Sequence, residues 1–278
     1  MPELPEVEAA RRAVRRAAVG RRIVAVRCAD DPIVFETTPP RLRRALLGRT
    51  VLGARRHGKH LWLVLDRRPW PVFHFGMTGG FHQPTKPGNR LIAYGSRHPA
   101  EVWPPRFTRL CLTLDDGNQI AFADARRLGR VRLRHDPPSE PPVSLLGFDA
   151  LRELPPPRRF RELLHERSAP LKAVLLDQTF AAGVGNWIAD EVLYQARLDP
   201  RRRAHTLSDA EADRLRAKLK SVVETSVRAL NDSDRYPRTW LFHDRWGRDD
   251  GALTSRGEPI RYVTIAGRTT AWVPSVQR

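Results

Sequence analysis

The chain has 278 residues, enough for roughly two domains, and carries a formal net charge of +18 with an isoelectric point of about 11.2. So large an excess of Lys and Arg predicts a polyanionic partner, for which nucleic acid is the simplest candidate and an acidic membrane surface the alternative. No apolar run approaches the roughly 20 residues of a membrane-spanning helix, and no signal peptide is evident. We therefore expect an intracellular protein without a membrane partner, in the cytoplasm or nucleoid if bacterial and in the nucleus if eukaryotic.

The first 135 residues are predicted to contain one helix followed by short strands. The helix is expected at about 3–19, where Val19-Gly20 ends it. The β-branched or alternating runs that follow are RIVAVRCA, TVLGARRHGKHLWLVLD, PVFHFGM, TRLCLTLDDGNQIAFAD and GRVRLR. The DDG at 115–117 is a hairpin signal within the fourth run. This pattern predicts a two-sheet β-sandwich with an N-terminal helix over residues 1–135.

Beyond residue 135 the pattern changes from strands to proline-rich chain and then to helices. Residues 136–157 are rich in proline and are predicted to be an interdomain linker. Helical periodicity over 158–235 predicts a helical domain, whose last helix has Ser208 as its cap and Glu211 three residues on, and runs to about Leu230. The runs RYVTI and TTAWVP, separated by the turn AGR, predict a hairpin within 236–278. The expected fold class is therefore α+β.

Neither the cysteines nor the histidines predict a metal centre. Cys28 and Cys111 are far apart and form no CxxC pair, which excludes a zinc site of four cysteines. None of the nine histidines lies at HxxxH spacing on an evident helix. We expect no metal ion and no other cofactor.

The opening MPELPEVE has two interpretations. Met1 before a small residue is normally removed, which would leave Pro2 as a terminal secondary amine and a possible nucleophile, with the carboxylates of Glu3 and Glu6 close by in sequence. Alternatively, Pro2 simply begins the first helix, where a missing N–H has no cost, and the glutamates favour the helix N-terminus. These residues alone do not decide between the two.

The segment DQTFAAGVGNWIADEVLYQARLDP at 177–200 also has two interpretations when it is taken by itself. Gly183 and Gly185 end one helix, and Asn186 begins the next. A helix N-terminus bracketed by glycines exposes backbone N–H groups and suits a phosphate, but a packing corner between two helices fits the same residues.

Taken together, these two segments resemble the formamidopyrimidine-DNA glycosylase/endonuclease VIII family of base-excision repair enzymes, over residues 1 to 278. Leu4 favours the formamidopyrimidine branch, and 177–200 resembles the family's helix–two-turn–helix signature. The resemblance implies a bifunctional DNA glycosylase/AP lyase acting on damaged double-stranded DNA as a monomer. Pro2 would attack C1′ of the damaged nucleotide and form an iminium, Glu3 would act as general acid at the sugar oxygen, and Glu6 would support them.

The resemblance also implies DNA contacts. Lys59 would bind the phosphate beside the lesion and assist elimination. Met77, Arg126 and Leu128 would fill the gap left by the flipped nucleotide, with Leu128 where relatives usually have phenylalanine. Arg109 and Arg127 would contact DNA phosphates, and Asn186 would also bind DNA.

The C-terminal segment resembles the zinc-less finger of plant formamidopyrimidine glycosylases. Arg268 in AGR matches the finger arginine, which would contact lesion phosphates and help the second elimination. The tryptophans and phenylalanine of YPRTWLFHDRWG are expected to pack the finger onto the helical domain.

The resemblance also implies a shortened loop, because the connection NDSDRYPRTWLFHDRWGR stands where bacterial members of the family have a longer one. This favours formamidopyrimidines and hydantoins over 8-oxoguanine as substrates. The alternatives are a glycosylase for oxidised pyrimidines, a non-catalytic binder of damaged DNA, and an RNA- or ribosome-associated basic protein.

Overall fold

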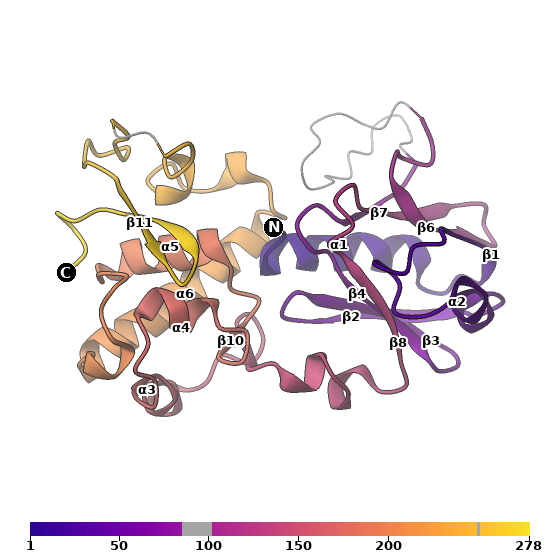
Figure 1. The fold of residues 1–278 in the computed structure, drawn as a ribbon, viewed down its shortest axis with the longest axis horizontal. Coiled ribbons are helices and arrows are strands. Elements are labelled where there is room, and N and C mark those ends of the chain that lie inside the picture. The colour runs from indigo at the N-terminus through magenta and orange to yellow at the C-terminus, as the bar shows by residue number, and fades with distance from the viewer. Residues whose placement is uncertain (85–101, 249–250) are drawn as a thin grey trace. The chain divides into compact units, whose positions relative to one another are not determined.

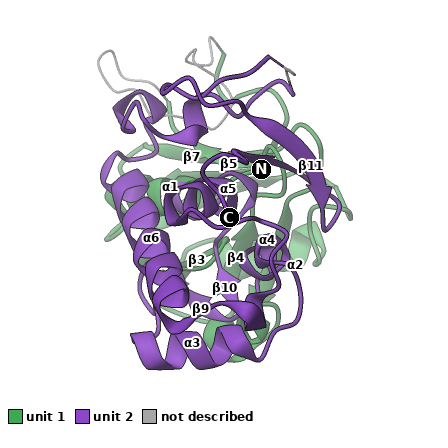
Figure 2. Cartoon of the chain, turned by 90° about the vertical axis from the view of Figure 1, so that its left-hand side faces the viewer, with its two compact units in different colours: residues 1–2, 6–145 green, residues 3–5, 146–278 purple. Residues whose placement is uncertain are grey.

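The structure is a computed structural model that describes residues 1–84, 102–248 and 251–278. The chain divides into two compact units: residues 1–2 and 6–145 form the first, and residues 3–5 and 146–278 form the second (Figure 2). No helix in these described ranges is long and apolar enough to cross a membrane. The predicted domain limits of 1–135, 136–157, 158–235 and 236–278 stay a prediction, although the division at 145 falls inside the proline-rich stretch.

The first unit contains two four-stranded antiparallel sheets (Figure 1). One sheet has the order β1-β6-β7-β5 and the other β2-β3-β4-β8. The elements in chain order are α1 (Leu4–Ala18), β1 (Ile23–Cys28), α2 (Pro39–Leu46), β2 (Val51–His57), β3 (His60–Leu65), β4 (Trp70–His74), β5 (Gly80–His82), β6 (Thr108–Leu114), β7 (Gln119–Ala123), β8 (Arg130–Arg134), and the 3-10 helices η1 (Pro137–Ser139) and η2 (Val143–Leu145). The predicted two-sheet sandwich with an N-terminal helix is confirmed, while α2 and β5 have no counterpart in the prediction.

Both sheets contribute to one core, because residues that alternate along a strand point to the same face. Leu61, Leu63 and Leu65 of β3 are buried in this core together with Leu110 and Leu112 of β6. Val7, Val14 and Ala18 on the apolar face of α1 pack into the same core. The DDG signal does mark a hairpin between β6 and β7, whose loop is four residues long, Asp115 to Asn118.

The second unit is mainly helical. Its elements are β9 (Phe148–Asp149), α3 (Pro157–His165), α4 (Leu171–Leu176), β10 (Ala181–Ala182), α5 (Asn186–Ala196), η3 (Ala204–Thr206), α6 (Asp209–Arg228), η4 (Ser233–Arg235), η5 (Leu241–His243), β11 (Arg261–Ile265) and β12 (Arg268–Trp272). The capping box predicted for α6 is confirmed, because Ser208 accepts the N–H of Glu211 and Glu211 accepts the N–H of Ser208. The helix ends at Arg228, before the predicted Leu230, which has a left-handed backbone.

The proline-rich stretch 136–157 is more regular than the predicted linker. It contains η1, η2 and β9, and α3 begins at its last residue. β9 pairs in parallel with β10, two residues against two. Short 3-10 turns and an edge pairing tolerate the prolines, which lack the N–H that a longer element would need.

The C-terminal hairpin pairs β11 with β12 around a two-residue turn. Ala266 and Gly267 have φ values of 49° and 69°, as a type I′ hairpin turn requires. Arg268 is therefore the first residue of β12 and not a turn residue as the AGR signal suggested. Its side chain is exposed at the tip of the hairpin.

Candidate active site

Glu3 and Leu4, which belong to the second unit, contact the start of α5. The Glu3 carboxylate accepts the backbone N–H of Trp187 at 2.9 Å and that of Ile188 at 3.2 Å. Leu4 continues this contact, since its N–H donates to the carbonyl of Gly183 at 3.0 Å. The first N–H groups of a helix have no partner within the helix and carry its partial positive charge, so they hold a carboxylate well.

The two glycines before α5 make room for these residues. A Cβ on Gly185 would lie 2.2 Å from the carboxyl carbon of Glu3, and one on Gly183 would lie 2.6 Å from the Leu4 side chain. Gly183 also has a φ of 102°, which L-residues rarely adopt. The anion at this helix N-terminus is thus Glu3 of the chain itself. Its carboxylate accepts the N–H groups that the sequence analysis considered for a phosphate.

Asn186 faces the finger hairpin. Its Nδ2 donates to the carbonyl of Thr269 at 2.9 Å, while its buried Oδ1 has no hydrogen-bond partner among the described residues. Asn186 was predicted to bind DNA, and the structure shows a contact with β12 for the amide nitrogen. The segment 177–200 is therefore both a packing corner and the support of an acidic residue.

Pro2 is not the residue that begins the first helix. α1 starts at Leu4, and Pro5 occupies its first turn, where the missing N–H has no cost. Pro2 is buried and precedes the helix, so the simpler interpretation of Pro2 as a helix-start residue does not hold. Glu6 is 8% exposed and lies in the first turn of α1, where a carboxylate favours the helix.

Lys59 lies in the two-residue turn between β2 and β3. Gly58 takes the first turn position with a φ of 53°, which suits a type II′ turn. The lysine is 6% exposed, so the alternative of an ordinary solvated lysine is wrong. The turn is braced by Arg56, whose Nη1 donates to the carbonyl of Gly58 at 2.8 Å.

Arg56 belongs to a buried ion cluster that the sequence did not reveal. Glu8 accepts from Arg56 Nε at 3.2 Å, from Arg11 Nη2 at 2.7 Å and from Arg12 Nε at 3.0 Å. Burial by itself raises the pKa of Glu8, but the hydrogen bond from Arg11 and the charge of Arg56 lower it to about 2. The cluster joins α1 to β2 and so supports the turn that carries Lys59.

The predicted gap-filling residues lie on two neighbouring loops of the first unit. Met77 is on the loop after β4, and its neighbour Thr78 donates to the Asp124 carboxylate at 2.9 Å. Asp124 also accepts the N–H of Gly129 at 2.7 Å, which closes the loop that carries Arg126 and Leu128. Leu128 is 42% exposed, as are several other large apolar side chains among the described residues.

The same loops touch at Gly76. A Cβ there would lie 2.3 Å from the backbone carbonyl carbon of Leu128, so only glycine fits between the two loops. The structure therefore brings Met77 and Leu128, which are far apart in sequence, onto adjacent loops. Arg126 is exposed on the second of them.

Arg127 and Arg109 share an acidic partner that sequence reasoning missed. Two nitrogens of Arg127 donate to the carboxylate of Asp31 at 2.9 Å each, and Arg109 Nη1 lies 3.4 Å from it. The hydrogen bond from Arg127 lowers the pKa of Asp31. Arg127 has a φ of 56°, so this bidentate pair also holds a left-handed backbone in place.

Tyr236, Trp240 and Phe242 pack as expected, whereas Trp246 is 52% exposed. Tyr236 stacks on Trp187 of α5 at 5.8 Å between ring centroids, and Phe242 meets Trp187 edge to face at 5.1 Å. Trp240 completes the cluster against Tyr236. This confirms that the segment packs the C-terminal region of the second unit onto α5.

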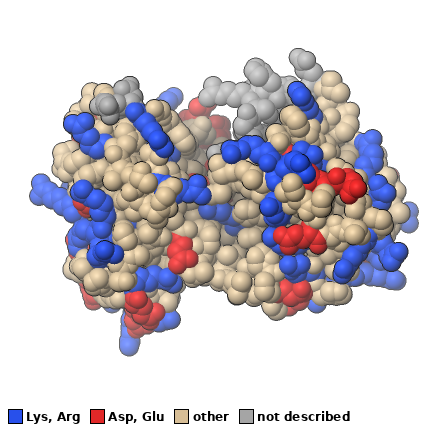
Figure 3. Space-filling view, viewed as in Figure 1, with Lys and Arg blue, Asp and Glu red and all other residues tan. Residues whose placement is uncertain are grey.

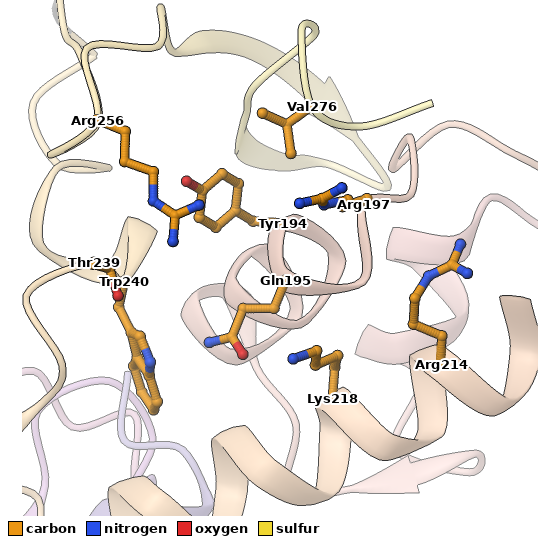
Figure 4. Close-up of a pocket in the computed structure, with 9 residues that line it drawn as sticks. All are labelled: Tyr194, Gln195, Arg197, Arg214, Lys218, Thr239, Trp240, Arg256 and Val276. Atoms are coloured by element: carbon orange, nitrogen blue, oxygen red, sulfur yellow. The ribbon is translucent and has the colours of Figure 1, made fainter.

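Basic side chains are frequent on the visible surface of each unit (Figure 3). They also line a pocket of about 650 Å³ in the second unit, at the carboxyl end of α5 (Figure 4). Arg197, Arg214 and Lys218 come from the end of α5 and from α6, and Arg214 Nε donates to the carbonyl of Ala196 at 2.8 Å. Cations at a helix carboxyl end stabilise its unpaired carbonyls. The pocket contains none of the predicted site residues, and no group of three possible metal ligands occurs among the residues that the structure describes.

Two family models match the chain in succession. The model of the formamidopyrimidine-DNA glycosylase N-terminal domain covers residues 1–131, and that of the formamidopyrimidine-DNA glycosylase H2TH domain covers residues 146–236. Formamidopyrimidine-DNA glycosylase of Arabidopsis thaliana is 41% identical over 281 residues, which span all of this chain and 71% of that protein. The enzyme of the same name from Thermus thermophilus is 36% identical over all of this chain and 98% of its own length.

Solved structures agree with these relatives. The crystal structure of the Thermus thermophilus protein has a TM-score of 0.79 at 35% identity and covers 99% of this chain and 98% of its own. Lactococcus lactis formamidopyrimidine-DNA glycosylase, bound non-covalently to DNA containing an AP site, has a TM-score of 0.82 at 25% identity and covers 99% of each chain. The chain therefore belongs to the formamidopyrimidine-DNA glycosylase family.

Proposed function

We propose that this protein is a bifunctional DNA glycosylase and AP lyase of base-excision repair, which removes oxidised purines from double-stranded DNA. The observation that carries the proposal is the placement of Glu3 on the N-terminus of α5, directly after Pro2, in a chain of this family. Such an enzyme works on genomic DNA and therefore inside the cell. Neither a metal nor another cofactor is required by the steps below.

The first step is displacement of the base by Pro2. After removal of Met1, the Pro2 nitrogen is a secondary amine, and a free α-amino group has a pKa of roughly 7.7–8.0, so part of it is neutral near physiological pH. As its lone pair forms a bond to C1′, the glycosidic C1′–N bond breaks and the base leaves, taking a proton from solvent. The Pro2 nitrogen gives its own proton to the Glu3 carboxylate, which passes it to O4′ as the C1′–O4′ bond opens, and a cationic iminium forms.

The iminium is the electron sink for strand cleavage. Loss of a proton from C2′ with departure of the 3′ phosphate is the β-elimination. Loss of a proton from C4′ with departure of the 5′ phosphate is the δ-elimination, and water finally releases Pro2. Lys59 and Arg268 would bind the phosphates that leave, because a fixed cation stabilises the charge that develops on them.

The two loops around Gly76 would hold the DNA open. Flipping a nucleotide costs a few kcal/mol, and apolar side chains inserted into the gap offset that cost. Met77 and the exposed Leu128 fit this role, with Arg126 beside them. For Arg127 and Arg109, the pairing with Asp31 supports a role in shaping the loop, with phosphate contact as a second role.

The proposed substrates are formamidopyrimidines and hydantoins, with weak activity on 8-oxoguanine. This ranking depends on the short connection at 231–248. The alternatives are oxidised pyrimidines as substrates, a non-catalytic damage-binding role and an RNA- or ribosome-associated role. The family membership favours the enzyme, because a binder has no use for a carboxylate fixed beside a terminal proline.

The decisive test is trapping with borohydride, which reduces an iminium to a stable covalent adduct. The protein processed at Met1 is expected to give an adduct with duplexes containing an abasic site or a formamidopyrimidine opposite cytosine. A form that retains Met1 has an acylated Pro2 nitrogen and should give none, and Pro2→Gly should give less. Pro5→Ala, a proline substitution in the same segment, serves as the control and should keep the adduct.

Each outcome has a clear meaning. If no duplex yields an adduct while binding to damaged DNA stays tight, the protein is a damage-binding protein and not an enzyme. If an oxidised pyrimidine gives more adduct than a formamidopyrimidine, the alternative substrate class replaces oxidised purines. Equal retention on undamaged RNA and on lesion DNA would favour the RNA-associated alternative.

A further inference from the structure

Neither outer edge of the finger hairpin, formed by β11 and β12, pairs with another strand among the described residues. The edge of β12 is the one that faces α5. Around a two-residue turn, Ile265 and Arg268 form the first hydrogen-bonded pair, and pairs alternate from there. The backbone groups of Thr269 and Ala271 consequently face away from β11. Such polar groups need partners when they are buried.

Two side chains of α5 supply those partners. Asn186 donates to the carbonyl of Thr269 at 2.9 Å, and Asp190 accepts the N–H of Ala271 at 3.2 Å. Residues four apart on a helix lie on the same face, which is why Asn186 and Asp190 both reach the edge of the strand. One turn of α5 thus takes the place of a third strand.

Asp190 is also the centre of a buried ion cluster. Its Oδ1 contacts Lys172 Nζ of α4, and its Oδ2 accepts from Arg245 Nε at 3.2 Å, from the segment that leads to the finger. Lys172 and Asp190 have fully buried side chains, and that of Arg245 is 5% exposed. Buried charges of this kind are held only where partners and geometry are good, so the cluster defines one arrangement.

The cluster also reaches the residue that begins α5. Lys172 Nζ donates to the backbone carbonyl of Asn186 at 2.8 Å. Asp190 is therefore linked through Lys172 to the turn of α5 whose N–H groups hold Glu3. The two ends of this network are Glu3 and the strand that begins with Arg268.

We infer that Asp190 is a positioning residue that fixes the finger hairpin on α5 without a metal, and that it sets the place of Arg268. The inference rests on the proposed function, because it deepens the role given there to Arg268. Ala271 is three residues from Arg268, about 10 Å along the strand, so a hairpin released at Ala271 moves its tip. Asp190 does not touch the reacting atoms and acts through Arg268.

Loss of this anchor should affect one step of the reaction more than the others. Pro2 and Glu3 perform base removal and β-elimination, whereas Arg268 is proposed to assist δ-elimination. Displacement of a contributing group by about 1 Å can reduce a rate by about 100-fold. Release of the finger should therefore reduce δ-elimination far more than the formation of the iminium.

The test is Asp190→Asn, measured on DNA with an abasic site. The amide is isosteric and can still accept one hydrogen bond, but it no longer balances Lys172 and Arg245. The ratio of δ- to β-elimination product is expected to fall by about 10- to 100-fold, while the yield of borohydride adduct stays within about twofold of that of the unmodified protein. Asp213→Asn is the matched control, because Asp213 pairs with Arg161 and has no described contact with the finger.

A second variant separates positioning from folding. Asp190→Asn combined with Arg245→Gln removes one negative and one positive charge, so it should recover stability lost in the single variant. The product ratio should remain low, because the finger still lacks its anchor. A ratio that returned to that of the unmodified protein would overturn the inference, as would an unchanged ratio in Asp190→Asn.

Hydrogen exchange gives a readout that does not depend on catalysis. In Asp190→Asn the amide of Ala271 is expected to exchange at least about tenfold faster, while the amides of Trp187 and Ile188 keep their protection. Unchanged exchange at Ala271 contradicts the inference even if the protein has no lyase activity. Conversely, absence of any adduct in the unmodified protein counts against the proposed function and leaves the exchange result to decide the anchoring role.

Discussion

Two buried carboxylates, Glu8 in the first unit and Asp190 in the second, are surrounded by basic side chains, yet they stabilise different features. Glu8 accepts from three arginines, two on its own helix and one on β2. Asp190 accepts from Lys172 and Arg245, which come from two separate segments, and also from the backbone N–H of Ala271. Arg56 of the first cluster braces the turn of Lys59, and Asp190 of the second holds the strand of Arg268.

A buried carboxylate among cations thus has two different roles in this protein. Where the partners lie on one helix and an adjacent strand, it contributes mainly to the stability of a fold that the hydrophobic core already specifies. Where the partners come from segments distant in sequence and include a strand edge, it decides where a separate hairpin is held. Stability measurements should therefore respond most to Glu8, and product ratios most to Asp190.

The largest effect is expected for Glu8→Gln. Removal of this charge takes from Arg11 and Arg56 the buried carboxylate that they share, and breaking a buried pair in this way costs about 3–5 kcal/mol. The free energy of unfolding in urea should fall by that amount. Glu36→Gln is the control, because Glu36 pairs with Arg132 while 41% exposed, and it should cost less than about 1 kcal/mol. Equal losses in the two variants would show that burial does not matter here.

The pH dependence of stability gives a second measurement of the contribution of Glu8. The pKa of Glu8 lies at about 2, below its ordinary value of 4.5, so its contribution is complete above pH 4.5 and is lost as the pH falls toward 2. This loss is about 3 kcal/mol for Glu8. Unfolding measured between pH 6 and pH 3 should therefore have a shallower slope in Glu8→Gln. A slope identical to that of the unmodified protein refutes this assignment.

Glu191, the neighbour of Asp190, is expected to behave in the opposite way. Burial raises the pKa of Glu191 to about 7, and its described partners are Gln195 and the N–H of Phe242 rather than a cation. Stability should therefore be complete below pH 4.5 and decrease as the pH rises to about 7, by about 3 kcal/mol. Glu191→Gln, which can still accept the N–H of Phe242, should remove this decrease. If the decrease persists in the variant, another group causes it.

The smallest effect on stability is expected for Glu211, a partly exposed carboxylate that pairs with Arg202. The hydrogen bond from Arg202 lowers the pKa of Glu211 to about 2, as low as that of Glu8, although the Glu211 side chain is 24% exposed. Water screens the pair at this exposure, and glutamine preserves the capping box. Glu211→Gln should therefore cost about 1 kcal/mol or less in thermal or urea unfolding. A cost close to that of Glu8→Gln would mean that the pKa, rather than burial, determines the stability contribution.

Several features could be predicted from the sequence because they depend on neighbouring residues. The period of the apolar residues indicated the strands of the first unit and the helices of the second, and Ser208 with Glu211 identified the start of α6. The short element β5 and the helix α2, with two prolines at its start, have too weak a pattern to predict. The motif around Pro2, with that at 177–200, was specific enough to identify the family.

The sequence singled out candidate site residues, but it did not show their surroundings. Glu3, Lys59 and Arg268 were singled out from the sequence, but the partner of Glu3 on α5 and the burial of Lys59 were not. The glycines before α5 fitted either a bound phosphate or a packing corner, and the structure shows that Glu3 takes the space. A pattern of glycines shows that something approaches the backbone, and only the packing shows what it is.

By itself, therefore, the sequence determined the class of fold, the order of the elements and the family, since periodicity, turn residues and an uninterrupted motif are local properties. Only the tertiary structure decided which partners the buried carboxylates meet: Arg127 for Asp31, Arg56 for Glu8, and Lys172, Arg245 and the N–H of Ala271 for Asp190. The physical reason is that a charge can be buried only beside a partner, and that partner is brought by packing of segments that lie far apart along the chain.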